Sequence, residues 1–414
     1  MENKFNRLIA LITSPKSKFV IITFVVSAIG FFKSFILLKI FDFEKLGIIA
    51  LSQTVTTTIS LLQIGAVTGA YRLFSYKREN ILKRVNAALL MFFVFLTILL
   101  CIAGVIVDFF YNTGISTSIL FLLIVIGVTS LYSNWVTCKL LGTKNIFILN
   151  KAQLSSAIVS FVITFLAKWI GLPAVLAGLL VQPLIIIGVA YLIVPSLIPG
   201  ISFLSFKKYI LKIISLGFVP YLTTGLTLFN SQLGRWVITF SLGTVILGKT
   251  FLITLFVSLV SVFPGAVSNL FFPSIIEKYE LNLKNDLKAT LKRQYLILGG
   301  YYLLVMLATI LLANTMVRLF LPKHIESVYL IYTIFPSLLF LHLSGPAITF
   351  FNAAKKFRLI LFGSLISVFT YVGLLSLYVI LQKPSLGGFF IIESISAFFF
   401  FIFNSYYFNK LNKS

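Results

Sequence analysis

Four ionisable side chains fall inside long apolar stretches of the sequence: Lys33, Arg235, His342 and Glu393. A charge at the centre of a bilayer costs at least about 2.5–3.5 kcal/mol on insertion scales, so such groups usually face an internal cavity. The two cations could hold an anionic group such as phosphate or pyrophosphate. Glu393 could bind H⁺ or Na⁺ as a coupling ion, or it could be the counter-ion of a buried cation. His342 could take the same coupling role, or it could only satisfy a neighbouring hydroxyl group.

Uncharged polar residues recur at helical spacing in two of the apolar stretches and could line the same cavity. One group lies between positions 48 and 70, and the other between 214 and 241. Such stripes can also join one membrane helix to another, so they agree with a cavity without requiring one. The side chains predicted to line the cavity are Gln53, Thr57, Ser60, Thr224, Thr227 and Asn230.

The composition indicates that these groups lie in a membrane protein. Of the 414 residues, 59% are hydrophobic and only 11% are charged, with a mean hydropathy of +1.07. A soluble domain carries about 25% charged residues, so a soluble enzyme, a disordered chain and a disulfide-stapled secreted domain are excluded. The net charge of +24 would suggest nucleic acid as a partner only in a soluble chain. We predict an all-α polytopic protein with about twelve spans, near 19–41, 48–70, 86–110, 118–138, 151–170, 173–194, 214–241, 248–272, 294–315, 328–351, 358–381 and 387–408.

The lysines and arginines predict the orientation of these spans. Of the 34, 25 lie in the alternate segments 1–18, 71–85, 139–151, 195–212, 273–293, 352–358 and 409–414, and seven lie in the other loops. Short loops rich in Lys and Arg stay in the cytoplasm, so both termini are predicted to be cytoplasmic. The longest loop, Glu277 to Arg293, has Tyr279, Leu283, Leu287 and Leu291 at helical spacing. It is predicted to be an amphipathic helix on the cytoplasmic face.

Ionisable residues at the ends of the spans complete the set of candidates. In this orientation Arg72 lies at the cytoplasmic end of the second span, and Lys39 and Lys249 lie at the outer mouth. Asp108 lies near the outer end of the third span. It joins Glu393 and His342 as a candidate for ion coupling or for the role of counter-ion.

The two halves of the chain are related by a weak internal repeat. An offset of 201 residues places Phe41–Leu51 over Leu242–Leu252, with Leu46 and Gly47 over Leu247 and Gly248. The same offset places Ser34, the neighbour of Lys33, over Arg235. Each half then contains six spans, so the repeats are predicted to be parallel lobes covering residues 1–200 and 201–414.

One motif is interpreted as a chance match. Gly243 to Thr250 satisfies the phosphate-binding pattern GxxxxGK(S/T). That pattern binds phosphate where a strand enters the loop and a helix leaves it. Here it joins two membrane spans on the predicted outer face, so we do not expect a nucleotide site.

These features resemble the multidrug/oligosaccharidyl-lipid/polysaccharide exporter (MOP) superfamily, whose fold is MATE-like. Within it the chain resembles the flippases of O-antigen and polysaccharide repeat units, also called Wzx-type translocases. The similar stretches are FDFEKLGIIALSQ at 41–53, LLQIG at 61–65, AYR at 70–72, RWVITFSLG at 235–243, and Pro273.

The resemblance implies a non-enzymatic flippase of the bacterial cytoplasmic membrane. It would move an undecaprenyl-pyrophosphate-linked oligosaccharide from the inner to the outer leaflet by alternating access. Arg72 would receive the pyrophosphate, Lys33 and Arg235 would hold it, and Lys39 and Lys249 would draw it outward. The implied partners are membrane lipids, the polysaccharide polymerase and the chain-length regulator, without nucleic acid. No cofactor is implied apart from H⁺ or Na⁺ as a coupling ion.

One position departs from the resemblance. Many relatives carry Asp before the arginine at the start of the second lobe, whereas here Gly234 precedes Arg235. No local carboxylate partner is therefore present, and Glu393 becomes the main candidate for ion coupling.

Other functions stay open on the sequence alone. A multidrug exporter of the same fold, with mostly cationic substrates, should line its cavity with acids, and here buried cations are at least as numerous as buried acids. A lipid II flippase would be expected to add two helices. A membrane polysaccharide polymerase would carry a large outer loop with catalytic Arg or His, whereas the predicted outer loops have about a dozen residues at most.

Overall fold

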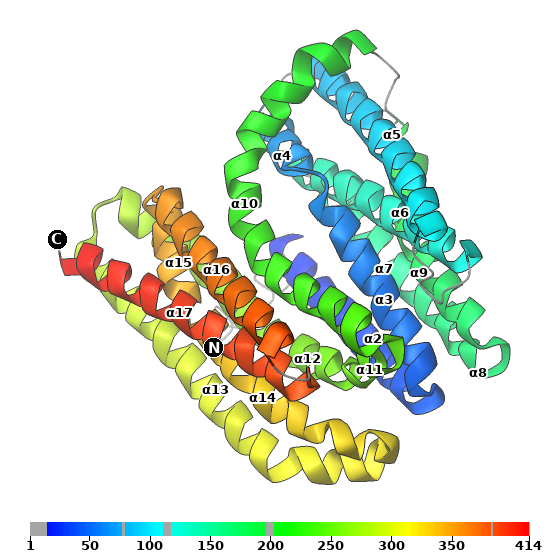
Figure 1. Ribbon diagram of the computed structural model, residues 1–414. Helices are drawn as coiled ribbons and strands as arrows, with labels where there is room; N and C mark the ends of the chain where they lie inside the picture. Colours follow the sequence, from blue (N-terminus) through cyan, green and yellow to red (C-terminus); the bar gives the residue numbers. More distant parts are fainter. Residues whose placement is uncertain are drawn as a thin grey trace, which may run out of the picture. The chain divides into compact units, whose positions relative to one another are not determined.

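The computed structural model describes residues 15–76, 79–110, 117–143, 145–195, 203–381 and 384–413, and within these ranges the regular structure is entirely helical (Figure 1). Each of the twelve predicted spans coincides with a helix or with two consecutive helices. Ten described helices are long and apolar enough to cross a membrane. An eleventh span is formed if α3 (Phe43–Leu61) and α4 (Ala66–Tyr76), which are bent by 61°, count as one. The chain is an all-helical multi-pass membrane protein.

The described helices form two compact units, and the first comprises the residues up to Lys33 and those from Ser52 to Leu222. Its main contacts join α9 to α7 and to α6. Gly178 of α9 permits the contact with α7, because a methyl group there would overlap the Thr164 hydroxyl. The helices that contribute to this unit are α2 (Pro15–Ile40), α3, α4, α5 (Glu79–Phe110), α6 (Thr117–Gly142), α7 (Ile146–Phe165), α8 (Ala167–Ile170), α9 (Leu172–Ile193) and the first part of α10 (Phe203–Leu242).

The second unit comprises Ser34–Leu51 and the residues from Thr223 onward. In it α17 packs against α14 and α16, and α12 packs against α13 (Figure 1). Besides the end of α2, the start of α3 and the rest of α10, its elements are α11 (Thr244–Lys249), α12 (Phe251–Glu280), α13 (Lys284–Phe320), the short helix η2 (Pro322–Ser327), α14 (Val328–Leu343), α15 (Gly345–Ala353), α16 (Phe357–Leu381) and α17 (Leu386–Lys413).

The sequence repeat suggests that the chain divides into two lobes at residue 200, but two segments pack with the opposite half of the chain. The Ser34–Leu51 segment packs within the second unit, and the part of α10 up to Leu222 packs within the first. Pro220 lies in α10 two residues before the point where the units divide. Helix α10 therefore contributes to both units.

A reciprocal helix contact supports the internal repeat. A methyl group on Gly47 in α3 would overlap the carbonyl oxygen of Thr244, and one on Gly248 in α11 would overlap the carbonyl oxygen of Phe43. The offset of 201 residues pairs Phe43 with Thr244 and Gly47 with Gly248. The two matching segments therefore pack on each other through the same two positions, and glycine removes the side chain at the point of closest approach.

The GxxxxGK(S/T) segment has no phosphate-binding loop. Its first residue, Gly243, has a φ of +87° and separates α10 from α11. The next six residues form α11, in which Gly248 is buried against the start of α3. A helix rather than a strand leads into the segment, so its backbone N–H groups do not form the cradle that the motif requires.

The segment from Glu277 to Arg293 is not a separate surface helix, so that prediction is wrong. Helix α12 continues to Glu280, and α13 begins at Lys284 and runs unbroken to Phe320. Leu287 and Leu291 are only 7% and 1% exposed and belong to an apolar core cluster of the second unit. The helical spacing therefore reflects the buried face of the first turns of a long helix.

A buried histidine that the sequence reasoning missed lies between α13 and α14. His324 in η2 is 1% exposed, and its Nε2 lies 3.1 Å from the carbonyl oxygen of Leu38 at the end of α2. Its ring packs edge-on against Phe43. Burial lowers the pKa of His324, the hydrogen bond to Leu38 opposes this, and the charge of Lys323 lowers the pKa further.

We expect the stability of the second unit to fall in acid because of His324. With a folded-state pKa below the ordinary 6.5, the unfolded chain binds this proton first. Stability is then lost as the pH falls below 6.5, by at most about 1.4 kcal/mol per pH unit for one proton. His324→Gln keeps an N–H donor for Leu38 but cannot titrate. Melting temperatures in detergent between pH 7.5 and 5 should therefore decline less steeply for the variant, and equal slopes would contradict the assignment.

Candidate functional site

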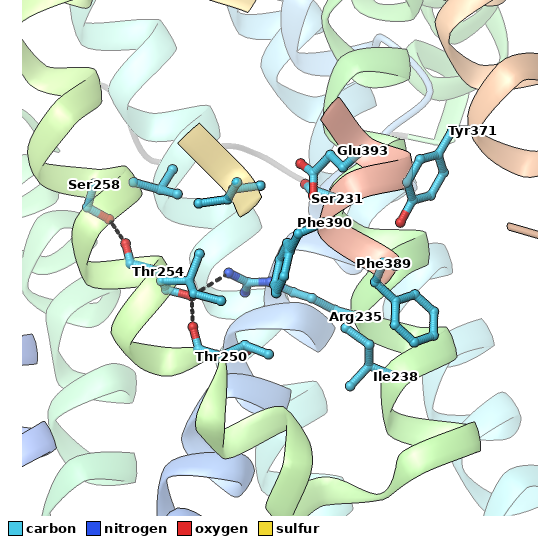
Figure 2. A pocket seen from close by; sticks show the side chains of 14 residues that line it. Ser231, Arg235, Ile238, Thr250, Thr254, Ser258, Tyr371, Phe389, Phe390 and Glu393 are labelled. Atoms are coloured by element: carbon cyan, nitrogen blue, oxygen red, sulfur yellow. Dashed lines mark hydrogen bonds between the residues drawn. The ribbon is translucent and has the colours of Figure 1, made fainter. Parts of the chain in front are cut away.

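Arg235 lies at the wall of a cavity of about 240 Å³ inside the second unit. The lining residues come from α10, α12, α14, α16 and α17 (Figure 2). One guanidinium nitrogen of Arg235, Nη2, donates a hydrogen bond of 2.9 Å to Oγ1 of Thr254 in α12. A guanidinium carries five N–H donors, so this bond leaves it the capacity to bind the oxygens of an anion.

Glu393 of α17 lines the same cavity, although it lies 158 positions from Arg235 in the sequence. The charges of the two side chains interact electrostatically. Figure 2 shows the guanidinium group directed toward Thr254, with the Glu393 carboxylate on the α17 side of the cavity. The structure therefore brings together the predicted anion-binding cation and the predicted coupling or counter-ion acid.

Gly234 makes room for a tyrosine at this cavity. A methyl group on Gly234 would overlap the hydroxyl oxygen of Tyr371 in α16, a side chain that is only 1% exposed. Tyr371 also interacts electrostatically with Glu393. The hydroxyl of Tyr371 thus occupies the space beside the backbone that a carboxylate at position 234 would need.

We expect Gly234→Ala to impair transport and Tyr371→Phe to rescue it. The added methyl group must displace the Tyr371 ring, because overpacking a tight site costs about 1–3 kcal/mol. Removing the Tyr371 hydroxyl oxygen makes room for the new methyl group. The next atom of the ring, Cζ, lies 3.5 Å from the position of that methyl group, which is an ordinary contact distance. Transport by the two single variants and the double variant checks this. A double variant as impaired as Gly234→Ala would contradict the assigned contact.

Asn230 does not lie at the wall of the cavity but in a buried network. Its Nδ2 donates to the hydroxyl oxygens of Ser367 at 3.0 Å and Ser396 at 3.3 Å. The two serine hydroxyls lie 2.7 Å apart. This network joins α10 to α16 and α17, so the polar stripe of α10 at this point connects helices. The side chains of Thr224 and Thr227, and that of Asp108 in α5, lie outside the described residues.

Lys33 belongs to the first unit. Its Nζ donates a hydrogen bond of 2.8 Å to Ser160 of α7, and Ser160 donates one of 2.7 Å to the carbonyl of Gly178 in α9. Lys33 is partly buried. Each predicted anion-binding cation therefore donates to a hydroxyl group of its own unit.

The first unit contains an uncharged polar cavity of about 310 Å³. The predicted residues Gln53 and Thr57 line it, whereas the Ser60 hydroxyl donates to the Thr56 carbonyl within α3. Its lining residues include no ionisable side chain. Sequence reasoning missed four polar lining residues, although three of them stand at helical spacing on α6 and could have been found as a stripe; they are Ser130, Ser133 and Asn134 on α6 and Gln182 on α9.

The remaining predicted cations lie near the ends of helices. Arg72 is exposed in α4, and its Nη1 donates to the carbonyl of Leu216 at 3.3 Å. Lys39 is exposed at the end of α2. Lys249 lies 3.7 Å from a carboxylate oxygen of Glu326 and 5.5 Å from the ring centre of Phe43.

His342 has local partners in the second unit. Its Nε2 lies 3.2 Å from the hydroxyl oxygen of Ser261 in α12. Its ring is stacked on that of Tyr302, at 5.8 Å between centroids. Neither cavity described above includes His342 among its lining residues, and these contacts match the alternative that it satisfies a neighbouring hydroxyl group.

The fold is similar to those of solved membrane transporters. A multidrug resistance MATE family transporter of the MOP superfamily, inward-facing, matches with a TM-score of 0.69 at 15% identity, over 94% of each chain. The lipid II flippase MurJ, in an inward closed conformation, matches with a TM-score of 0.66 at 18% identity, over 94% of this chain and 87% of its own.

A third match is a MOP superfamily transporter from Pyrococcus furiosus, for which reverse polarity of the binding pocket suggests a different function. Its TM-score is 0.59 at 15% identity, over 97% of this chain and 96% of its own. No protein-family model matches the chain, and no curated protein matches it. The chain therefore has the MATE-like fold of MOP-superfamily transporters over nearly its whole length.

Proposed function

We propose that this protein is a flippase for a polyprenyl-pyrophosphate-linked oligosaccharide, such as an O-antigen or related polysaccharide repeat unit. It moves the lipid-linked sugar from the inner to the outer leaflet of the cytoplasmic membrane by alternating access and performs no covalent chemistry. The observation that carries the proposal is Arg235, which faces a cavity inside the second unit and is held there by Thr254. A guanidinium in a site of low dielectric favours an anionic, phosphate-like group.

Each cavity, taken by itself, has the chemistry to bind one part of such a substrate. The cavity of the second unit carries a cation for a pyrophosphate. The cavity of the first unit offers hydroxyl and amide groups without charge, which suits the hydroxyl groups of a sugar. We assign Glu393 as the group that either binds the coupling ion or balances Arg235, because its charge interacts with that of Arg235.

The main rival is a multidrug exporter, the description of the MATE transporter that the fold matches. An exporter of organic cations needs an acid without a competing basic group in its cavity. Here Glu393 shares the cavity with Arg235, whose positive charge would repel a cationic substrate. The flippase MurJ and the transporter with the reversed pocket have the same fold, so the sign of the charge in the pocket is a better guide to the substrate than the fold.

A gene deletion tests the proposal in cells. Loss of a flippase should leave undecaprenyl-linked repeat units on the inner leaflet, where no polymerase on the outer face can use them. We expect the lipid-linked repeat unit to accumulate and the surface polysaccharide to disappear, and a plasmid copy to restore both. Normal surface polysaccharide in the deletion strain, with increased sensitivity to cationic drugs, would instead favour the multidrug exporter.

A further inference from the structure

A separate cavity of the second unit is surrounded by lysines that the sequence explains by topology alone. It has a volume of about 320 Å³ and lies where α12 ends and α13 begins. Four lysines line this lysine cavity, and its lining residues include no carboxylate. They are Lys278, Lys284, Lys288 and Lys356.

Three separate segments of the chain meet at the lysine cavity. Its lining residues come from 278–288, from Phe350, Ala354 and Lys356, and from Leu411. The loops concerned, 273–293, 352–358 and 409–414, are three of those that the distribution of Lys and Arg predicts to be cytoplasmic. Topology requires basic residues in each loop, but it does not require the loops to bring them around one cavity.

The base of the lysine cavity is a firm apolar surface. Leu287 and Phe350 are 7% and 6% exposed and belong to the core cluster of the unit. The ring of Tyr279 packs edge-on against Phe350, at 6.0 Å between centroids. Because these apolar residues are packed in the core, they fix the backbone from which the lysines project around the cavity.

Local contacts are defined for one lysine of the rim and for one neighbouring acid. The ammonium group of Lys278 donates to Thr290 Oγ1, which donates in turn to the carbonyl of Asp286 at 2.7 Å. The neighbouring acid Glu280 is already paired, at 3.1 Å, with Lys355, which does not line the cavity. Four lysines gathered around one cavity, with no carboxylate among its lining residues, make the cavity electropositive and favour the binding of an anion.

We propose that the lysine cavity binds the phosphate group of a membrane lipid on the cytoplasmic side. The cavity lies where the helices of two candidate spans end, at Glu280 and Lys284, in a segment predicted to face the cytoplasm. Basic pockets between membrane helices on this side suit anionic head groups. The phosphate comes from a resident anionic phospholipid or from the pyrophosphate of the lipid-linked substrate before transport; the second source rests on the proposed function. The site shares no lining residue with the Arg235 cavity.

The test measures lipid binding to the purified full-length protein by native mass spectrometry. The probes are phosphatidylglycerol, zwitterionic phosphatidylcholine and undecaprenyl pyrophosphate. The variant Lys284→Gln/Lys288→Gln/Lys356→Gln removes three exposed rim charges. Its matched control, Lys207→Gln/Lys208→Gln/Lys212→Gln, removes three exposed lysines from α10. We expect the rim variant to lose at least about tenfold in affinity for the anionic probes, because each lysine contributes appreciably to binding at an anionic surface.

The outcomes distinguish the source of the phosphate and separate this proposal from the flippase assignment. A loss for phosphatidylglycerol alone identifies a resident phospholipid, and a loss for undecaprenyl pyrophosphate identifies the entering substrate. Arg235→Ala should leave the binding of phosphatidylglycerol unchanged, because Arg235 does not line the lysine cavity, so the site stands even if the transport assignment fails. Binding by the rim variant within about twofold of the wild type, or an equal loss in the control variant, would overturn the proposal.

Discussion

Replacing Arg235 with alanine is expected to abolish flipping of the lipid-linked oligosaccharide while the protein still inserts into the membrane. Arg235 supplies the positive charge of its cavity, where it is held by Thr254. Removing one partner of a desolvated charge pair costs about 2–5 kcal/mol of binding, or a factor of at least about 30 in affinity. Transport of the labelled substrate and the amount of protein in the membrane should be measured together. We expect Lys33→Ala to abolish transport as well.

Two companion variants separate the role in binding from a role in folding. Arg235→Ala leaves Glu393 without its cation, so part of its effect could arise from an uncompensated acid. In Arg235→Ala/Glu393→Gln neither charge remains, and we expect stability to recover while transport stays absent. Arg235→Lys keeps the positive charge but loses the planar guanidinium, which can donate two parallel hydrogen bonds to a phosphate. This variant should therefore retain part of the activity. Full transport by Arg235→Ala would refute the role of this cation.

Replacing Gly248 with valine is expected to prevent correct folding of the second unit. Any Cβ at this position overlaps the carbonyl oxygen of Phe43, which is backbone and cannot rotate away. Overpacking costs about 1–3 kcal/mol where side chains can adjust, and a backbone clash should cost more. Gly47→Val should behave in the same way, because Gly47 meets Thr244 in the reciprocal contact. Fluorescence-detected size-exclusion chromatography and melting temperature measure the effect.

Gly299→Ala is the matched control for this prediction. Gly299 lies within α13 of the same unit, and nothing lies within 4 Å of the Cβ that would be added there. Alanine favours a helix over glycine by about 1 kcal/mol, so this variant should be neutral or more stable. If Gly248→Val folded and melted like Gly299→Ala, α3 and α11 could not be in the contact described.

Most of the helical architecture could be predicted because apolar runs of membrane length carry a strong signal. All twelve predicted spans fall on helices. The break between α3 and α4 was not predicted, because hydropathy joins the two helices into one span, although Gly65 is a helix-end signal at this point. There Ile64 and Gly65 have φ values of 48° and 81°, and a backbone turn of this kind leaves no change in hydropathy. The exchange of Ser34–Leu51 into the second unit depends on tertiary packing that hydropathy does not record.

The individual residues of the candidate site could be predicted from the sequence, but not which of them lie together in one cavity. An intramembrane charge stands out in an apolar run, so Arg235 and Glu393 can be found individually, but nothing in the sequence indicates that α10 and α17 bring them to one cavity. Asn230 shows the reverse: its spacing suggests the cavity wall, and packing places it between helices. The lysines around the lysine cavity are attributed to topology by the sequence, because composition counts charges without locating them in space.

The most direct test of the central claim is transport by the purified protein in unilamellar vesicles. A fluorescently labelled polyprenyl-pyrophosphate oligosaccharide is placed in both leaflets, and an impermeant reductant bleaches the label in the outer leaflet. With H⁺ or Na⁺ gradients of either direction, we predict that wild-type protein makes nearly all of the label accessible, whereas Arg235→Ala vesicles match protein-free ones. Wild-type vesicles that leave the inner-leaflet label protected, while they transport an organic cation, would contradict the assignment of this protein as a flippase.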